Sequence, residues 1–390
     1  MRLKVLHVTE AWQAGVGVLV DNLVRRQAND PRIQAIHLAC SSSRTPETLD
    51  YSEFGTVAVH RYESTRHPWK LAKTIVAIRH IVERVKPDII HAHSTFPGVY
   101  CRLLLGGTPI LYCAHGWCFA QEIHPLKKTV FGVTEAALAK LTAGIVHVSR
   151  SELRHANRYL VHSRKSFVIH PGVRAPLLSG TPAVEVDPRK INLAFVGRFD
   201  RQKGLDLLLG SLGALKREDL HLYLIGDYDR ESPKRRSSFT NARITELGWI
   251  AQPRIDDYLQ QMDAIVMPSR WEAFGLVATE AMRNSKAAIV SDRGGLPEQI
   301  IHGYNGLVFS PEEPAGLLRA LEGLNKADLA EMGANARRVW ERCFTEDRSY
   351  EALVEAYAEL TARRRGTTTT SPGSALPVRT AAGATLAAGS

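Results

Sequence analysis

Long hydrophobic runs are missing from this sequence. No stretch of its 390 residues approaches the ~20 consecutive apolar residues that a membrane-spanning helix needs. The first residues, MRLKVLHVTEAW, hold too short an apolar run for a secretory signal. Because 44% of the residues are hydrophobic and 23% are charged, the composition is that of a globular protein and not of a collagen-like, coiled-coil or disordered one.

Cysteine is also scarce, with five residues scattered along the chain. An odd number without regular spacing fits reduced thiols better than a disulfide framework, so we expect a cytoplasmic protein. Neither the cysteines nor His124 shows the spacing of a zinc site. No metal is therefore expected.

Acidic residues are few in the first part of the chain. Residues 1–180 contain 23 Lys and Arg but only 12 Asp and Glu, a balance of +11, whereas the remaining residues have a balance of −1. A basic half indicates an anionic partner such as a membrane surface, a lipid phosphate or a nucleic acid, unless the charge serves solubility alone. Since no platform of aromatic and basic residues is evident, nucleic acid is not an expected partner.

One predicted helix of the basic half, 127–141, combines a basic start with apolar residues along one stripe. Lys127 and Lys128 supply the charge. The stripe is typical of an ordinary packed helix, and it also fits a helix that docks on anionic lipid. The second alternative would place the protein peripherally at the inner face of the cytoplasmic membrane.

Short apolar runs alternate with longer helical patterns along most of the chain. Continuous apolar runs are typical of strands buried on both faces of a parallel sheet. Such strands are predicted at 4–7, 89–92, 110–113, 144–148 and 166–169, and again at 191–196, 222–225, 264–267 and 288–290. Helices are predicted at 18–27, 69–86, 127–141, 151–159, 204–215, 253–261 and 276–283. The alternation predicts an α/β fold of two Rossmann-like, doubly wound domains that face a central cleft.

Changes in composition predict the domain boundaries. We expect an N-terminal domain over 1–175, a linker rich in proline and small residues over 176–190, and a C-terminal domain over 191–345. A helix over 346–362 carries an apolar stripe and is expected to pack back toward the N-terminal domain. Residues 363–390 lack periodicity and large apolar side chains, which predicts a disordered tail.

The segment PSRWEAFGLVATEAM places two carboxylates, Glu272 and Glu280, around the predicted start of a helix. Gly275 permits a tight turn there, and the amides of Phe274–Leu276 would be free at a helix N-terminus, where an anion is favoured. The pattern predicts a phosphate seat flanked by two acceptors for sugar hydroxyls. Taken alone, the pair of glutamates favours a simpler interpretation, in which Glu272 caps a helix and Glu280 lies on the surface.

The segment FVGRFDRQKGLD predicts a strand, a loop and a helix, with Arg198 and Lys203 in the loop. A guanidinium binds a diphosphate bidentately and an ammonium binds it as a point charge. A basic surface loop would look the same in isolation. Together with the glutamate pair and the segment DRGGLPEQIIHGYNGLVF, the loop indicates one binding constellation.

These three segments resemble, in order and spacing, the family 4 retaining glycosyltransferases of the GT-B architecture. The resemblance implies transfer of a sugar from a nucleotide-diphosphate donor, UDP- or GDP-linked, to a saccharide or lipid-linked saccharide with retention of configuration. It further implies a role in polysaccharide or cell-envelope glycan synthesis, with no cofactor besides the donor substrate. Asn305 and Glu298 would be structural loop residues near the donor.

The resemblance assigns the donor-site roles residue by residue. Arg198 and Lys203 would bind the diphosphate and stabilise its charge as it leaves. Glu272, helped by the amides of Phe274, Gly275 and Leu276, would hold hydroxyls of the transferred sugar. Glu280 would accept the ribose hydroxyls of the nucleotide.

The N-terminal half resembles the family less closely. Gly15 and Gly17 match its first glycine loop, which would approach the donor. His91 and His93 match one strand-end motif, and His115 matches another that would face the reacting sugar and its acceptor. A histidine satisfied by the backbone is the alternative for His115.

Other functions are weaker matches to the sequence. The glycine loop lacks the third glycine of a dinucleotide fingerprint, which argues against a nicotinamide enzyme. Asp227 and Asp229 resemble an Asp-x-Asp metal motif, but they follow a strand of the second half, where a polar loop is expected. A nucleotide-sugar epimerase of the same fold and a non-catalytic nucleotide-binding protein remain alternatives, since one fold hosts many chemistries.

Overall fold

The structure is a computed structural model that describes residues 2–10, 12, 15–65, 67–104, 106–181, 183–228, 243–313 and 315–362. The chain divides into two compact units. The first unit runs from the N-terminus to His170 and resumes at Ser349, and the second unit runs from Pro171 to Arg348. The predicted tail, 363–390, lies outside the described residues.

The first unit is built around a parallel sheet in the order β3-β2-β1-β4-β5-β6-β7. Its strands are β1 (Leu3–Thr9), β2 (Ile33–Ser41), β3 (Val57–Tyr62), β4 (Ile89–His93), β5 (Ile110–Cys113), β6 (Gly144–His147) and β7 (Ser166–Val168). Its helices are α1 (Gly15–Ala28), α2 (Pro68–Val85), α3 (Thr95–Arg102), α4 (Pro125–Ala139), α5 (Arg150–Arg158) and most of α11 (Glu346–Ala362). Strands β1, β4, β5 and β6 are almost wholly buried because helices cover both faces of the sheet.

The second unit repeats this plan with the order β10-β9-β8-β11-β12-β13. Its strands are β8 (Ile191–Val196), β9 (Leu220–Ile225), β10 (Ile244–Gly248), β11 (Ala264–Met267), β12 (Ala287–Ser291) and β13 (Gly306–Phe309). Its helices are α6 (Leu205–Ala214), α7 (Ile255–Leu259), α8 (Leu276–Arg283), α9 (Gly316–Glu322) and α10 (Lys326–Cys343). In both sheets the first strand lies beside the fourth, which is the Rossmann order, so the predicted α/β class with two Rossmann-like units is confirmed.

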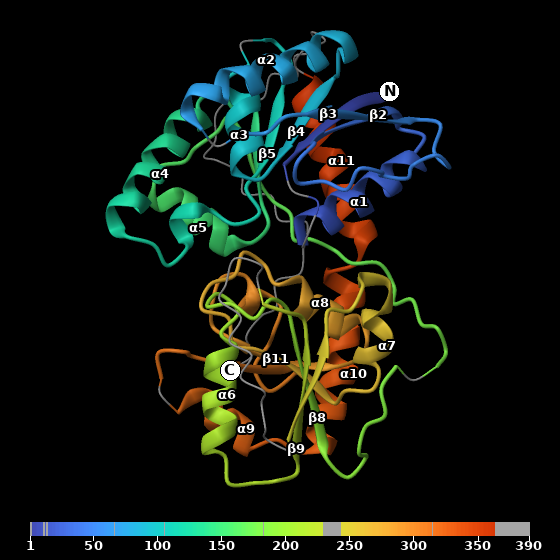
Figure 1. Cartoon of the computed structure of the whole chain (residues 1–390), viewed down its shortest axis with the longest axis vertical. Helices are drawn as coiled ribbons and strands as arrows, with labels where there is room; N and C mark the ends of the chain where they lie inside the picture. The colour runs from blue at the N-terminus through green and yellow to red at the C-terminus, as the bar shows by residue number, and fades with distance from the viewer. Residues whose placement is uncertain are drawn as a thin grey trace. The chain divides into compact units, whose positions relative to one another are not determined.

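Helix α11 completes the first unit from the far end of the chain (Figure 1). The Tyr350 hydroxyl donates to Asp30 over 2.7 Å, and Arg32 binds Glu351 through two contacts of 2.7 Å each. The Tyr357 hydroxyl lies 2.7 Å from Nδ1 of His91 in β4. The last described helix is therefore tied to strands and helices made from the first hundred residues.

The structure shifts the expected boundary between the units. Residues 171–175 and the predicted linker 176–190 group with the second unit. The backbone amides of Leu177 and Ser179 donate to Asp256 and Asp257 over 3.0 and 2.8 Å, which fastens the segment to α7.

Several strands are not apparent from the sequence pattern. β3 and β10 lie at sheet edges and are mostly half-buried, and polar residues such as Gln34 and His37 interrupt the apolar run of β2. Edge strands need no continuous apolar run, because only part of each strand is covered. No helix among the described residues is long and apolar enough to cross a membrane.

Candidate functional site

In the second unit, several of the predicted site residues cluster between β8 and β11, at the point where the order of strands in the sheet reverses. β8 and β11 are neighbours there, although β9 and β10 separate them in the chain. Ligands of open α/β sheets bind outside the carboxyl ends of the strands at such a switch point. The loop after β8 carries Arg198 and Lys203, and the loop after β11 carries Glu272.

Lys203 and Glu272 face each other across these two loops. Nζ of Lys203 lies 2.6 Å from Oε2 of Glu272, and the two side chains are 18% and 10% exposed. An ammonium has three N–H donors and a carboxylate has acceptor sites on both oxygens, so the pair keeps capacity for further partners. The structure therefore brings together one cation and one acceptor of the predicted constellation.

Backbone and side-chain contacts hold the two loops together around this pair. The amide of Arg270 donates to the carbonyl of Gln202 over 2.8 Å, and Nε2 of Gln202 donates to the carbonyl of Trp271 over 3.2 Å. The Arg270 guanidinium binds Asp206 bidentately at 2.7 and 2.6 Å. Such paired contacts fix orientation as well as adding energy, so Glu272 and Lys203 sit on a rigid frame.

Arg198 lies at the rim of the same frame. Its guanidinium pairs with Asp200 at 2.9 Å and donates to Oε1 of Gln202 over 3.1 Å, and its side chain is 43% exposed. Gln202 thus links Arg198 to the loop of Glu272. The two predicted cations share one loop but have different carboxylate partners.

Two glycines allow the loops to approach so closely. Gly204 has φ +70°, and a Cβ there would lie 2.1 Å from the carbonyl oxygen of Pro268. Gly294 follows β12 with φ +59°, and a Cβ there would lie 1.6 Å from the carbonyl oxygen of Glu272. No side chain fits at either position, so the loops after β8 and β12 each approach the loop that carries Glu272 backbone to backbone, at Pro268 and at Glu272.

Replacing Gly294 with alanine should therefore destabilise the second unit and displace Glu272. Gly303 is a matched control, since it has φ +77° but a Cβ there would have no atom within 4 Å. Left-handed strain of about 1–3 kcal/mol is common to both variants. We expect Gly294→Ala to lower the unfolding free energy by clearly more than Gly303→Ala in chemical denaturation. Equal losses would show that the close approach to Glu272 contributes nothing.

Glu280 lies in α8 and is 7% exposed. Nε2 of Gln252 donates to its Oε1 over 2.6 Å. Burial raises the pKa of the Glu280 carboxyl above its usual value, while Arg283 and Gln252 act in the opposite direction. Sequence reasoning did not single out Gln252, which no spacing rule connects to Glu280.

Phe274, Gly275 and Leu276 lie where α8 begins. Gly275 is the residue that precedes the helix, and Phe274 is buried. Gln299, which sequence reasoning also missed, donates from Nε2 to the Phe274 carbonyl over 2.6 Å and accepts from Thr279. The buried side-chain amide of Gln299 thereby fixes the start of α8.

In the first unit, His115 follows β5 with φ +53°, a left-handed conformation that is uncommon for a residue other than glycine. The next amide, that of Gly116, donates to Oε1 of Glu152 over 2.6 Å, and the amide of Val148 donates to Oε2 over 2.8 Å. Backbone outliers of this kind persist where the surroundings fix them, often at functional sites.

His115 belongs to a cluster of histidines that sequence reasoning only partly anticipated. Nε2 of His115 lies 3.1 Å from Nδ1 of His93, and Nε2 of His93 lies 3.0 Å from Nδ1 of His7. The ring of His91 lies beside that of His93, with ring centroids 4.0 Å apart. His7 was not singled out, although a histidine inside the apolar run LKVLHVT is the signal that marks it.

His7, His91 and His93 each bring one ring nitrogen within 4.8 Å of the other two, a grouping that also suits a metal ion. The 3.0 Å contact between His7 and His93 is a hydrogen-bond distance and needs a proton on one nitrogen, whereas a metal needs both lone pairs. The cluster as described is therefore arranged for hydrogen bonding. Of the predicted Asp-x-Asp pair, Asp229 lies outside the described residues.

Gly15 and Gly17 do not form a separate loop. They occupy the first turn of α1, which begins at Gly15. A Cβ at Gly17 would lie 1.7 Å from the carbonyl oxygen of Trp12, so the close approach of backbone requires glycine there. Both residues belong to the first unit, as His115 does.

The buried histidines make stability depend on pH. Burial lowers the pKa values of His7 and His147 to about 4. Because their pKa in the unfolded chain is near 6.5, the folded state binds fewer protons, so stability is full above that pH and falls as pH drops toward 4. Between pH 6.5 and 4, each of the two histidines changes the free energy of unfolding by on the order of 3 kcal/mol.

His147→Leu should reduce this pH dependence. Neither ring nitrogen of His147 has a hydrogen-bond partner among the described residues, so a leucine leaves no buried polar group unpaired. We expect unfolding midpoints of the variant to equal or exceed those of the parent at pH 7.5 and to fall less between pH 6.5 and 4.5. An unchanged slope would contradict the lowered pKa.

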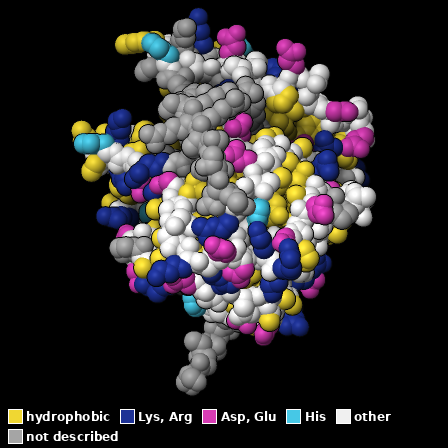
Figure 2. All heavy atoms as spheres, turned by 60° about the horizontal axis from the view of Figure 1, so that its bottom comes forward, with side chains coloured by type: hydrophobic (Ala, Val, Ile, Leu, Met, Phe, Trp, Pro, Cys, Tyr) yellow, Lys and Arg dark blue, Asp and Glu magenta, His cyan; other side chains and the backbone are white. Residues whose placement is uncertain are grey.

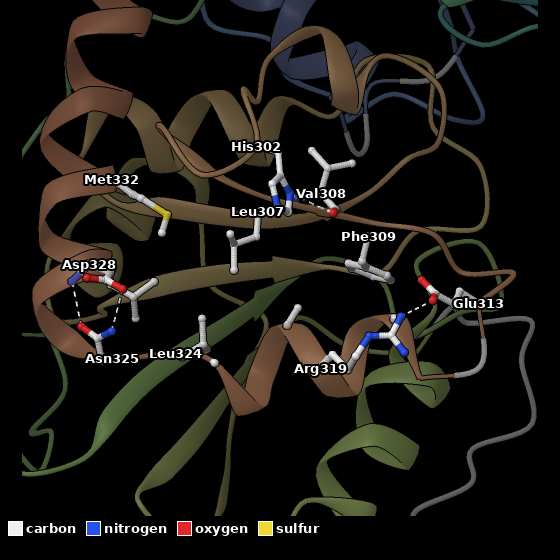
Figure 3. Close-up of a pocket in the computed structure, with 14 residues that line it drawn as sticks. His302, Leu307, Val308, Phe309, Glu313, Arg319, Leu324, Asn325, Asp328 and Met332 are labelled. Carbon is white, nitrogen blue, oxygen red and sulfur yellow. Dashed lines mark hydrogen bonds and ion pairs between the residues drawn. The ribbon is translucent and has the colours of Figure 1, made fainter.

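A cavity of about 440 Å³ lies in the second unit among β13, α9 and α10 (Figure 3). Apolar side chains of Leu307, Leu324 and Met332 line it. At its edges, Arg319 pairs with Glu313, and Asn325 caps α10. None of the residues predicted for the donor site lines this cavity.

Two family models match the chain. The model described as Glycosyltransferase Family 4 matches residues 14–175, and the model described as Glycosyl transferases group 1 matches residues 182–339. The two matches together take in most of the described residues of both units.

Relatives match over much of their length. An uncharacterized 41.2 kDa protein in cps region of Klebsiella pneumoniae is 28% identical over 324 residues, which are 80% of this chain and 87% of that protein. The D-inositol 3-phosphate glycosyltransferase of Pseudarthrobacter chlorophenolicus is 26% identical over 296 residues, which are 68% of this chain and 69% of that protein.

Solved structures share the fold. Sucrose-phosphate synthase from Thermosynechococcus elongatus has a TM-score of 0.79 at 19% identity, covering 93% of this chain and all of that one. Anabaena HepE, solved in complex with UDP and glucose, has a TM-score of 0.72 at 17% identity, covering 92% of this chain and all of that one. With both family models, these matches show that the chain is a family 4 glycosyltransferase with the GT-B fold.

Proposed function

We propose that this enzyme transfers a sugar from a UDP- or GDP-linked donor to a saccharide or lipid-linked saccharide, with retention of configuration, in polysaccharide or cell-envelope glycan synthesis. UDP is the first nucleotide to test, because the fold relative HepE was solved with UDP and with UDP-glucose. The acceptor would be held by the basic first half of the chain.

The observation that carries the proposal is the 2.6 Å contact between Lys203 and Glu272 at the switch point of the second sheet. Transfer from a nucleotide sugar needs a cation at the diphosphate and an acceptor at the sugar hydroxyls, side by side. Lys203 supplies the first and Glu272 the second, on loops that cannot separate without breaking the contacts of Arg270.

The remaining donor contacts follow from the same frame. Arg198, partly exposed at the rim, would bind the diphosphate bidentately. The amides of Phe274, Gly275 and Leu276 at the start of α8 would assist Glu272, and Glu280 would accept the ribose hydroxyls. The ionised carboxylate of Glu280 would accept best; burial raises its pKa, and Arg283 and Gln252 act in the opposite direction.

The chemistry needs little acid catalysis, since a nucleoside diphosphate is already a good leaving group. As the glycosidic bond breaks, negative charge grows on the diphosphate oxygens, where Lys203 and Arg198 would stabilise it. The acceptor hydroxyl would attack the anomeric carbon from the face that the diphosphate leaves, and its proton would pass to the departing diphosphate oxygen. His115 would contact the reacting sugar, and Gly15 and Gly17 in the first turn of α1 would approach the donor.

A screen of nucleotide sugars by thermal shift tests the proposal, because a tight donor stabilises the folded state by mass action. Titration calorimetry with UDP and GDP gives the affinity. We expect one nucleoside diphosphate to bind and its sugar donor to be hydrolysed slowly without acceptor. Absence of any nucleotide binding would refute donor use, and a rearranged sugar nucleotide would indicate an epimerase.

Contact with an anionic membrane is the second element of the proposal, and α4 supports it. Basic and acidic side chains are intermixed on the face drawn in Figure 2, so charge alone marks no docking surface there. On α4, by contrast, Leu126, Val130 and Val133 are spaced as one helical stripe and are 67%, 56% and 65% exposed. Lys127 beside them is exposed as well.

Val130→Asp combined with Val133→Asp should release the protein from vesicles that contain phosphatidylglycerol. The change removes apolar contact and adds two negative charges at the anionic surface. We expect at least a tenfold loss of binding in co-sedimentation, since burying each valine is worth about 1.5 kcal/mol or more. Val76→Asp, on exposed surface of α2, is the matched control. Equal binding of all three proteins would refute docking through α4.

A further inference from the structure

A chain of hydrogen bonds runs through the first unit and ends at His115. Gln27 of α1 lies between Tyr357 of α11 and His7 of β1. Its Nε2 donates to the Tyr357 hydroxyl over 3.3 Å, and its Oε1 lies 2.8 Å from Nε2 of His7. From His7 the chain continues through His93 to His115, with nitrogen separations of 3.0 and 3.1 Å.

The amide of Gln27 sets the direction of every bond in this chain. An amide oxygen only accepts, so Nε2 of His7 must carry the proton. A neutral imidazole has one N–H, which leaves Nδ1 of His7 to accept from Nε2–H of His93. By the same step, Nδ1 of His93 accepts from Nε2–H of His115. His115 is then left with a bare lone pair on Nδ1.

Neutrality of the three rings is a condition for this argument, and burial supplies it. Desolvation lowers the pKa values of His7 and His115 to about 4 and that of His93 well below its usual range. His7 and His93 are 0% and 2% exposed, so bulk water does not compete for their nitrogens. Reversing one bond would force the next to reverse or leave a buried group unpaired, at a cost of about 1–3 kcal/mol.

The series of hydrogen bonds ends at Nδ1 of His115, and a ligand would be needed there to supply the next donor. Nδ1 of His115 is buried and has no hydrogen-bond partner among the described residues. The ring is held there by a left-handed backbone, and Ser94, which follows His93, has φ +71° as well. Two residues with left-handed backbone at the ends of neighbouring strands indicate that the surrounding structure holds the histidine side chains in place despite backbone strain.

We propose that Gln27 is a positioning residue that fixes His115 in the Nε2–H tautomer, so that Nδ1 accepts a hydrogen bond from a hydroxyl of the transferred sugar or of the acceptor. This inference rests on the proposed function for the identity of that hydroxyl. Tyr357 supports Gln27 by accepting its N–H, which keeps the amide oxygen turned toward His7. His115 is thus a hydrogen-bond acceptor and selects a substrate group that can donate.

Nitrogen-15 NMR of the full chain tests the tautomer without any substrate. Two-bond proton–nitrogen correlations distinguish a protonated ring nitrogen from a bare one, and His115→Gln identifies the signals of His115. We expect Nε2 protonated and Nδ1 bare at pH 7.5. The opposite pattern, or a metal ion retained by the histidine cluster after purification, would overturn the proposal. This readout stands even if the enzyme proves to use another donor.

Gln27→Leu and Gln27→Glu separate positioning from folding. Leucine removes the acceptor for His7, so the second tautomer of His115 should appear, whereas glutamate keeps an acceptor and should preserve the parent pattern. Turnover of the leucine variant should fall in proportion to the fraction of His115 that keeps a bare Nδ1, with affinity for the nucleoside diphosphate, which lacks the sugar, unchanged. An unaltered tautomer in Gln27→Leu, or turnover lost equally in both variants, would refute the role of Gln27.

Discussion

Glu272→Gln is expected to lower kcat/KM for sugar transfer by about 10²-fold, the scale of losing hydrogen bonds to a charged group at about 1.5–3 kcal/mol. Glutamine keeps the shape of the side chain, but it removes the charge that accepts sugar hydroxyls and holds Lys203 at 2.6 Å. Affinity for the nucleoside diphosphate should stay equal or increase, because Lys203 is released toward phosphate. Steady-state kinetics and calorimetry measure the two effects separately.

Glu313→Gln is the matched control for this change. Glu313 also pairs with a cation, Arg319, but its side chain is 55% exposed and lies at the edge of the cavity away from the donor loops. Exposed pairs of this kind contribute about 0–1 kcal/mol, so the control should keep full activity. A Glu272→Gln enzyme with the kcat/KM of the parent would exclude contact between Glu272 and the reacting sugar.

The double change Arg198→Ala with Lys203→Ala is expected to abolish measurable binding of the nucleoside diphosphate. Each charge-assisted bond to phosphate contributes about 1.5–3 kcal/mol, so the affinity should fall by at least about 10²-fold. We take the lower end because Arg198 is 43% exposed and its charge is partly screened by solvent. Titration calorimetry at two salt concentrations gives the loss and its electrostatic share.

A control for net charge is available on the same unit. Arg189→Ala with Arg319→Ala also removes two cations, which are 89% and 55% exposed and outside the donor loops. That variant should bind the nucleotide like the parent, and His115→Ala should bind it normally while turning over slowly. If the Arg198 and Lys203 variant kept its affinity, the diphosphate would have to lie elsewhere.

The sequence predicted most strands inside the two sheets and the edge strand β7, and it missed the inner strand β2 and the edge strands β3, β10 and β13. β11 is a continuous apolar run and β8 is apolar apart from Asn192, and both lie in the middle of the second sheet. β10 has no fully buried residue, so no apolar run marks it. The alternation of strands and helices occurs twice along the sequence, and this repetition predicts two similar units. It does not predict where each edge strand lies.

The candidate site was predictable to the extent that it follows strand ends. Lys203 and Glu272 are 69 residues apart, and parallel topology brings their loops together. The supporting amides were not predictable, because Gln252, Gln299 and Gln27 act through contacts with residues distant in the chain. Their side chains carry no charge and follow no motif, so only the packed structure shows what they do.

The return of the chain to its first unit at Ser349 has a consequence for how the protein is made. On the ribosome, the whole second unit is synthesised before the helix that supplies Tyr350 and Tyr357. Until then Asp30 and His91 lack their hydroxyl partners. The earliest strands to emerge therefore belong to the last structure to be completed, and a fragment cut at the unit boundary would never acquire its closing helix.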